Sequence, residues 1–195
     1  MGRTQAYDTA EVVGAARNLF WQKGFDAVSV SDVERATGLS RSSVYHAFGS
    51  MRGLFDAVAQ EYLTTVVRPQ LEPLRAPEVA PDALQKHLRR MAAAIERLSD
   101  SGDPTGCLLV ATTGTTLGDD AAVREVIAAY HAELLAAVSA GVAARYPDAD
   151  AATAADRATI ITGALVAAQT LARINPAEAT RLLDVTAATL DKQLG

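Results

Sequence analysis

Apolar residues recur at three- and four-residue spacing along almost the whole chain, and no polar–apolar alternation lasts beyond a few residues. A period near 3.6 residues predicts amphipathic helices, whereas alternation would predict strands. We therefore expect an all-α fold of about nine helices. The proline-rich segment LRAPEVAPD is the best candidate for a linker. It separates an N-terminal unit from a C-terminal helical bundle, residues 75–195.

Capping residues predict where the helices begin and end. Asp8 and Ser31 are each followed three residues later by glutamate, the spacing of a capping box, and they predict the starts of the first two helices. Gly24 and Gly38 predict the ends of these helices, and Ser40 predicts the start of a third. Further helices are expected from Met51, with Pro69 and Pro73 kinking or ending it, from Pro81, and over residues 105–117, 120–145, 150–173 and 176–193.

Residues 40–48, SRSSVYHAF, form the second of two short helices joined by a turn that contains glycine, which is the plan of a helix-turn-helix. The apolar residues of this helix share one face. The other faces carry short hydroxyls, an arginine, a phenol and an imidazole, which are groups suited to contact DNA phosphates and base edges. The alternative interpretation is a three-helix packing unit with a polar outer face.

Residues 26–58, DAVSVSDVERATGLSRSSVYHAFGSMRGLFDAV, resemble the DNA-binding domain of TetR-family transcriptional regulators. The resemblance covers roughly residues 6–65, with the helix-turn-helix at 29–48. The matching residues are Gly24, Phe25, Ser29, Gly38, Tyr45 and Phe48. The resemblance implies that the helix starting near Ser40 enters the major groove. It also implies base-edge contacts from Arg41, Ser42, Ser43 and His46, and phosphate contacts from Ser29, Ser31, Ser40 and Tyr45. Ser31 and Ser40 can equally be plain helix caps.

The chain departs from the family pattern at the start of the fourth helix. Met51 stands where the family commonly has a lysine, so the usual amine-to-phosphate contact is in doubt, and Arg52 is the candidate to replace it. The whole chain carries a net charge of −5, but residues 1–52 hold six basic and five acidic side chains. This balance permits DNA binding without demanding it, because counterion release depends on cations placed locally.

The second half of the chain carries no catalytic or metal-binding motif. His87 and His131 are isolated, and we expect each to be an ordinary surface or hydrogen-bonded histidine. We therefore expect no enzyme activity, no metal and no cofactor. A helical-bundle enzyme would need distant ionisable residues to meet in the fold.

Residues 104–118, PTGCLLVATTGTTLG, are almost uncharged and predict a buried segment. Its threonines can bond back to their own helix or line a cavity for a small molecule. The GCLLV sequence is similar to one in a subgroup of TetR-family regulators. We expect Trp21 and Phe25 in the core. The candidate pocket residues are Tyr62, Leu88, Met91, Cys107, Val110, Thr113, Tyr130 and Gln169.

Cys107 is the single cysteine of the chain, which excludes an intrachain disulfide. It is either an inert buried thiol or a sensor of oxidants or electrophiles, and the second role would require a lowered pKa. The chain has no uncharged apolar run of eighteen residues and no leader, and Ala6 lies where an N-myristoylation signal would need serine or threonine. We expect a cytoplasmic protein without membrane contact.

The final two helices are apolar on broad faces, which predicts that they pair across a two-fold axis to form a homodimer. They could instead only close the core of one subunit. With the helix-turn-helix, this predicts a ligand-responsive transcriptional repressor that binds a palindromic, double-stranded DNA operator as a dimer. The small-molecule effector is unknown. The alternative is an architectural DNA-binding protein without an effector.

Overall fold

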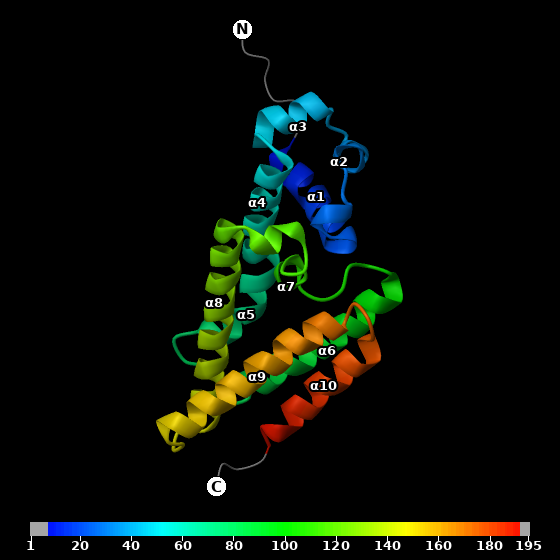
Figure 1. Ribbon diagram of the computed structural model, residues 1–195. Coiled ribbons are helices and arrows are strands. Elements are labelled where there is room, and N and C mark those ends of the chain that lie inside the picture. The colour runs from blue at the N-terminus through cyan, green and yellow to red at the C-terminus, as the bar shows by residue number, and fades with distance from the viewer. Residues whose placement is uncertain (1–7, 192–195) are drawn as a thin grey trace.

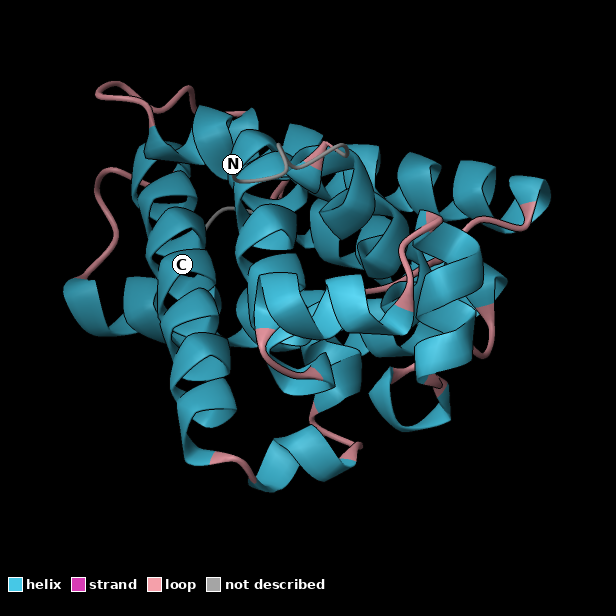
Figure 2. Ribbon diagram, turned by 90° about the horizontal axis from the view of Figure 1, so that it is seen from above, coloured by secondary structure: helices cyan, strands magenta, loops and turns pink. Residues whose placement is uncertain are grey.

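The computed structural model describes residues 8–191, which contain helices and loops and no strand (Figures 1 and 2). The predicted domain start at residue 6, the absent lipid signal at Ala6 and the predicted helix end at residue 193 lie outside these residues. The helices are α1 (Thr9–Lys23), α2 (Val30–Thr37), α3 (Arg41–Phe48), α4 (Met51–Tyr62), α5 (Arg68–Arg75), α6 (Ala83–Ser101), α7 (Leu108–Thr112), α8 (Ala121–Arg145), α9 (Ala151–Leu171) and α10 (Pro176–Thr189). The all-α prediction is confirmed. Counting α4 and α5 as one continuous rod, residues 8–191 form nine α-helices.

Local capping explains the first helices, with one correction to the sequence prediction. Gly24 adopts φ +80 and donates its N–H to the carbonyl of Phe20, which ends α1 as predicted. The capping box of α2 is formed by Ser29 and Asp32, whereas Ser31 lies within the first turn. The prediction that Ser31 caps α2 was therefore wrong. Ser29 fulfils the role because its hydroxyl accepts from Asp32 N at 3.2 Å and its own N–H donates to the Asp32 carboxylate at 2.9 Å.

The rod from α4 to α5 passes through two prolines that were predicted to kink or end it. A π-helical segment, Leu63–Val67, joins the two helices, and Pro69 falls in the first turn of α5. A proline is tolerated in a first turn because its missing N–H has no intrahelical partner there. Pro73 lies inside α5, two residues before the helix ends at Arg75.

The segment after α6 differs most from its prediction as a buried helix over residues 105–117. Only α7 is α-helical, and Thr113 and Gly114 are exposed. The hydroxyls of Thr112, Thr113 and Thr115 donate to the carbonyls of residues three or four positions earlier, at 2.7–2.8 Å. These threonines thus bond to their own segment and compete with regular helix continuation.

The two ends of the molecule have different architectures (Figure 1). Helices α1–α3 cluster around the top of α4, while α10 packs against both α6 and α9 at the opposite end. By length and composition alone, α8 could cross a membrane, with a mean hydropathy of 1.6 over its most apolar window. Here α8 packs against α9 and α5. Core helices of soluble proteins have the same composition, so this is weak evidence for a membrane span.

Candidate DNA-reading helix and interior pocket

One buried residue and one capping residue fix the position of α3 and leave one side of this helix exposed. Val44 is completely buried, and the Ser40 side chain accepts from Ser43 N at 3.3 Å. Arg41, Tyr45 and His46 are exposed, as is Ser42, and the Arg41 guanidinium lies 5.6 Å from the centre of the Tyr45 ring. α3 lies at the end of the molecule opposite to α10 (Figure 1). Its polar side chains are therefore free to meet a large partner.

The turn between α2 and α3 sets the orientation of α3 relative to α2. Gly38 adopts φ +71, a left-handed conformation that favours glycine. The Glu34 carboxylate accepts from the backbone N–H of Arg41 at 2.6 Å and so ties α2 to the first turn of α3. Ser29 and Ser40 are both helix caps. Ser31 is exposed on α2, and Ser43 is half-buried with its hydroxyl 3.0 Å from that of Ser40.

Arg52, the predicted phosphate contact at the start of α4, is paired with two carboxylates in the structure. Its guanidinium donates to the Asp56 carboxylate at 3.0 Å and forms a short ion pair with Asp120, the N-cap residue of α8. These pairs satisfy Arg52 and connect α4 to α8. The physical reason is that Asp120 lies 68 positions away in sequence and only the fold brings it near. A phosphate near the start of α4 would compete with these two carboxylates for the Arg52 guanidinium.

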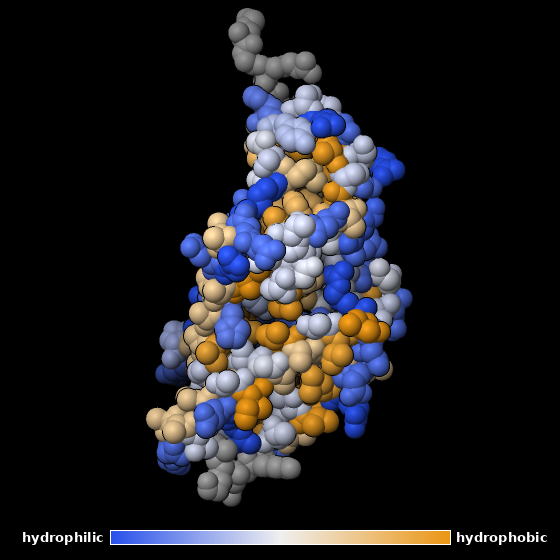
Figure 3. All heavy atoms as spheres, in the orientation of Figure 1, coloured by the Kyte–Doolittle hydropathy of each residue, from blue (hydrophilic) through white to orange (hydrophobic). Residues whose placement is uncertain are grey.

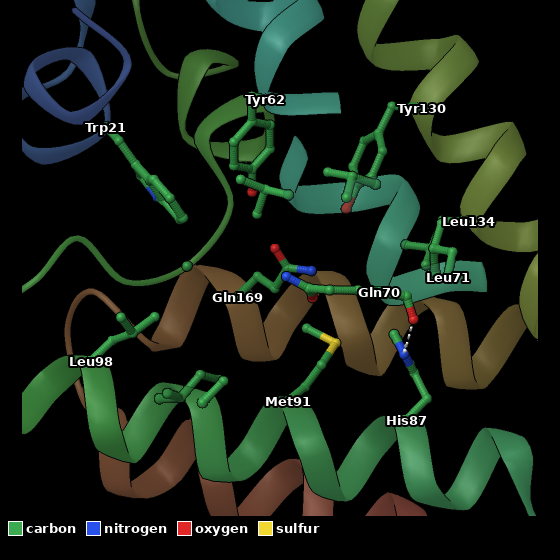
Figure 4. Close-up of a pocket in the computed structure, with 15 residues that line it drawn as sticks. Trp21, Tyr62, Gln70, Leu71, His87, Met91, Leu98, Tyr130, Leu134 and Gln169 are labelled. Atoms are coloured by element: carbon green, nitrogen blue, oxygen red, sulfur yellow. Dashed lines mark hydrogen bonds between the residues drawn. The ribbon is translucent and has the colours of Figure 1, made fainter. Parts of the chain in front are cut away.

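An interior cavity of about 80 Å³ lies between the α4–α5 rod, α6, α8, α9 and the last turn of α1 (Figure 4). Four of the predicted pocket residues line it: Tyr62, Met91, Tyr130 and Gln169. Cys107, Val110 and Thr113 instead line a neighbouring hollow, of which Gln169 is also a wall. Leu88 lines neither of the two, so this prediction was wrong. It is completely buried on α6, in the hydrophobic core.

Every titratable group that lines the cavity is uncharged near pH 7. Burial raises the pKa of Tyr62 and Tyr130, and the negative charge of a Cys107 thiolate would raise both further. Burial lowers the pKa of His87 to about 4, although a hydrogen bond with the Gln70 carbonyl opposes this. The cavity is therefore apolar with a few neutral polar groups, the usual character of a small-molecule site.

Sequence reasoning missed most of the cavity lining, including two residues with polar side-chain atoms, Trp21 and His87. Trp21 was assigned to the core, but its ring lines the cavity and packs edge-to-face on Tyr62, with centroids 5.1 Å apart. His87 was expected to be a surface or hydrogen-bonded residue. It is 3 % exposed, and its Nδ1 lies 3.2 Å from the Gln70 carbonyl oxygen. No local pattern could have identified either residue, because the cavity forms between helices that are remote in sequence.

The N-terminal unit is tied to the C-terminal bundle near this cavity. Arg173, just beyond α9, donates to the carbonyls of Trp21 at 2.8 Å and Gln22 at 3.2 Å, at the end of α1. The backbone N–H of Thr116 donates to the Asp26 carboxylate at 2.9 Å. The last turn of α1 thus belongs to the wall of the cavity and to the contact between the two units.

The outer surface of α9 and α10 exposes two large hydrophobic side chains among polar ones. Ile160 is 71 % exposed and Val185 is 54 % exposed, and both line a surface hollow of about 410 Å³ between the two helices. Hydrophobic residues gather over the lower half of the molecule, where α9 and α10 lie (Figure 3). Contiguous exposed apolar surface of this kind marks interaction sites.

Comparison with known proteins agrees with this geometry. A family model described as "Bacterial regulatory proteins, tetR family" matches residues 12–58, which include α2, α3 and most of α1 and α4. The HTH-type transcriptional repressor BdcR of Escherichia coli (strain K12) is 38 % identical over 109 residues, 56 % of this chain and 54 % of that protein. Residues 12–58 therefore carry a DNA-binding domain of the tetR type. The HTH-type transcriptional repressor ComR of the same organism is 29 % identical over 132 residues, 67 % of this chain and 61 % of that protein.

The alignments span little more than half the length of these two curated TetR-family relatives, whereas a solved structure matches along the whole chain. The TetR family transcriptional regulator CifR, solved as a cysteine mutant with 26 bp double-strand operator DNA, has a TM-score of 0.77 and 27 % identity. The alignment covers 98 % of this chain and 100 % of that one. These relatives are transcriptional regulators, not enzymes. In residues 8–191 of this chain, no cluster of three or more His, Cys, Asp or Glu side chains could hold a metal ion.

Proposed function

We propose that this protein is a cytoplasmic transcriptional repressor that binds a palindromic DNA operator as a homodimer and responds to a small molecule. The observation that carries the proposal is the exposed polar side of α3, held by the buried Val44 and presented at one end of the molecule. The base-edge contacts come from Arg41, Ser42, Ser43 and His46. The phosphate contacts come from Ser29, Ser31, Ser40 and Tyr45.

The apolar surface of α9 and α10 supports the homodimer. Ile160 and Val185 would be covered by the same helices of a second copy, in an isologous four-helix contact. A pair of reading helices then faces half-sites about 34–36 Å apart. We expect light scattering at micromolar concentration to give twice the 20.4 kDa mass of the chain. A monomer would mean that α9 and α10 only close the subunit's own core.

The cavity supports the effector response. Its walls come from both units, because Trp21 lies on α1 and Tyr62 lies on α4, whereas His87 and Gln169 belong to the bundle. A ligand can change DNA affinity only if it binds two arrangements of these units with different affinity. Because residues of both units line the cavity, the contacts of a bound ligand would change when the two units move relative to each other. An architectural protein with a filled core would have no such wall.

The test begins with selection of bound sites from random duplex DNA, followed by affinity measurements on the selected site. We expect Tyr45→Ala to weaken binding to all sequences alike, and Arg41→Ala also to relax base preference, each by about tenfold. Arg89→Ala removes the same charge from an exposed position on α6, at the end of the molecule opposite to α3, and is the matched control. Wild-type protein that prefers no duplex over bulk competitor, even at low salt, would refute the proposal.

Salt dependence gives an independent measurement. Lys23 and Arg35 are both paired with Asp32, and Arg52 is paired with Asp56 and Asp120, so α1–α4 offer few free cations to phosphates. Each neutralised phosphate contributes a slope of about 0.9 in the logarithm of affinity against that of salt. We expect a shallow slope of about 4 or less per protomer.

A further inference from the structure

Two buried polar atoms at the interior cavity have no hydrogen-bond partner within residues 8–191. They are Nε1 of Trp21 and Nε2 of His87. Trp21 and His87 lie at opposite ends of the cavity, with Met91 between them (Figure 4). Leaving a buried donor or acceptor unpaired is costly. A ligand that pairs with both atoms therefore gains affinity beyond that of apolar contact alone.

The two atoms require opposite hydrogen-bonding partners. The indole N–H of Trp21 can only donate. The Nδ1 of His87 lies 3.2 Å from the carbonyl oxygen of Gln70, and because a carbonyl only accepts, Nδ1 carries the hydrogen. Nε2 of this neutral ring therefore presents a lone pair. One end of the cavity donates a hydrogen bond and the other end accepts one.

The lining of the cavity excludes charge. It contains no Asp, Glu, Lys or Arg, and its tyrosines and histidine are neutral near pH 7. A charged ligand would lose its hydration here without gaining a counter-ion. Arg90 and Arg97 line only an outer hollow, which shares His87 and Met91 with the cavity.

The volume sets the size of the ligand. At about 80 Å³, the cavity is smaller than the engineered cavity of about 150 Å³ that holds benzene. Met91 lies in its wall, and a methionine side chain adapts readily to a ligand because it is unbranched and flexible. Because benzene has six heavy atoms, a ligand of about six heavy atoms is an upper limit here, and it fits only if side chains such as Met91 move to enlarge the cavity.

We propose that the effector is a compact, uncharged hydroxy-carbonyl compound, whose carbonyl oxygen accepts from Trp21 Nε1 and whose hydroxyl donates to His87 Nε2. This assignment rests on the proposed effector response. Because Trp21 lies on α1, the ligand touches the DNA-binding unit directly as well as the bundle. The hydrogen bond of the ligand carbonyl therefore depends on the position of α1, and the hydrogen bond of the ligand hydroxyl attaches the ligand to α6.

The chain contains one tryptophan, so an ¹⁵N–¹H spectrum shows one indole cross-peak, that of Trp21. The probe is 4-hydroxybutan-2-one, and we expect it to shift this peak downfield in a saturable manner. Pentan-2-one lacks the hydroxyl and should bind about tenfold more weakly, while still shifting the peak. The anion 4-hydroxybutanoate should leave the peak unchanged.

Variants assign the two ends. Trp21→Phe keeps an aromatic ring and loses the N–H, and His87→Leu removes the acceptor. Each should weaken binding of 4-hydroxybutan-2-one about tenfold by calorimetry. His131→Leu, an exposed position on α8, is the matched control and should bind as the wild type does. Thermal melting followed by circular dichroism checks that each variant is folded.

Two results would overturn the assignment. The first is the absence of an indole shift with both neutral probes. The second is binding of 4-hydroxybutanoate as tightly as the neutral probes, which would place recognition at Arg90 and Arg97. Operator binding is measured separately and without probe. Intact operator binding with no probe binding removes only this assignment. Probe binding with no change in operator affinity supports the ligand class and removes the proposed effector response.

Discussion

Lowering the pH from 7 to 5 should destabilise the folded protein through one buried imidazole, that of His87. Burial lowers its pKa to about 4, against about 6.5 in an unfolded chain. Between these values the unfolded state binds a proton that the folded state does not, so the free energy of unfolding falls as the pH falls. For this pair of pKa values, the loss between pH 7 and pH 5 is about 2 kcal/mol.

The assay is urea unfolding at pH 7, 6 and 5 at one protein concentration, since dimerisation would make stability depend on concentration. His87→Gln removes the titration and keeps a donor for the Gln70 carbonyl. His131→Gln alters an exposed histidine and is the matched control. We expect the wild type and His131→Gln to lose about 2 kcal/mol more than His87→Gln between pH 7 and pH 5.

Other shifted groups act in a different pH range. The pKa of Asp32 is lowered by hydrogen bonds from Ser29, and that of Glu133 by Arg68. Their contributions are present above the unfolded carboxyl values and are lost only as the pH falls below about 4.5. An equal loss of stability in the wild type and in His87→Gln between pH 7 and pH 5 would refute the reasoning, as would an NMR titration of His87 near pH 6.5.

Three further predictions follow from single contacts. Gly106 adopts φ +77, and a Cβ there would lie 2.3 Å from the carbonyl oxygen of Gln169, so Gly106→Ala should cost at least about 2 kcal/mol in urea unfolding; an unchanged midpoint would contradict this. Cys107 is 1 % exposed, so a thiol reagent should modify it only after denaturation, and rapid reaction of the native protein would revive the sensor hypothesis. Arg52→Gln should leave affinity for the selected operator within about twofold at fixed salt, because Arg52 is held by Asp120; a loss of tenfold or more would restore its role as a phosphate contact.

Helix boundaries set by local chemistry could be predicted from the sequence. Gly24, Gly38 and Ser40 act as predicted, because a glycine in a left-handed conformation or a serine cap involves only neighbouring backbone groups. The prediction for Ser31 was wrong because two nearby serines, Ser29 and Ser31, both have an acidic residue three positions later, and the capping-box pattern does not choose between them. Near Pro69 the regular α-helix gives way to a π-helical segment, Leu63–Val67, so the predicted break takes the form of a change in helix type.

The candidate pocket was only partly predictable, for a geometric reason. Leu88 and Met91 belong to one apolar stripe of α6, and helical periodicity places both inside the protein without saying which neighbour each meets. In the fold Leu88 joins the core, whereas Met91 borders a gap where several helices diverge. Cys107 contacts the two cavity tyrosines, Tyr62 and Tyr130, but lines the neighbouring hollow together with Thr113. The sequence thus predicts burial well, but the choice between core and cavity depends on contacts between remote helices.

The position of Trp21 limits how a ligand can act on DNA binding. Its ring faces the cavity while its carbonyl accepts from Arg173, so the same residue holds α1 to the end of α9. A ligand that displaces the Trp21 ring can have two effects. The ring can rotate within the cavity and leave α1 in place, or the last turn of α1 can move and strain the Arg173 contacts. In the proposed dimer, only the second response would change the distance between the two α3 helices. Arg173→Met should therefore reduce the effect of a ligand on operator affinity more than it reduces ligand affinity itself, because coupling is the difference in contacts between two arrangements. Equal effects on both quantities would mean that α4 alone transmits the change.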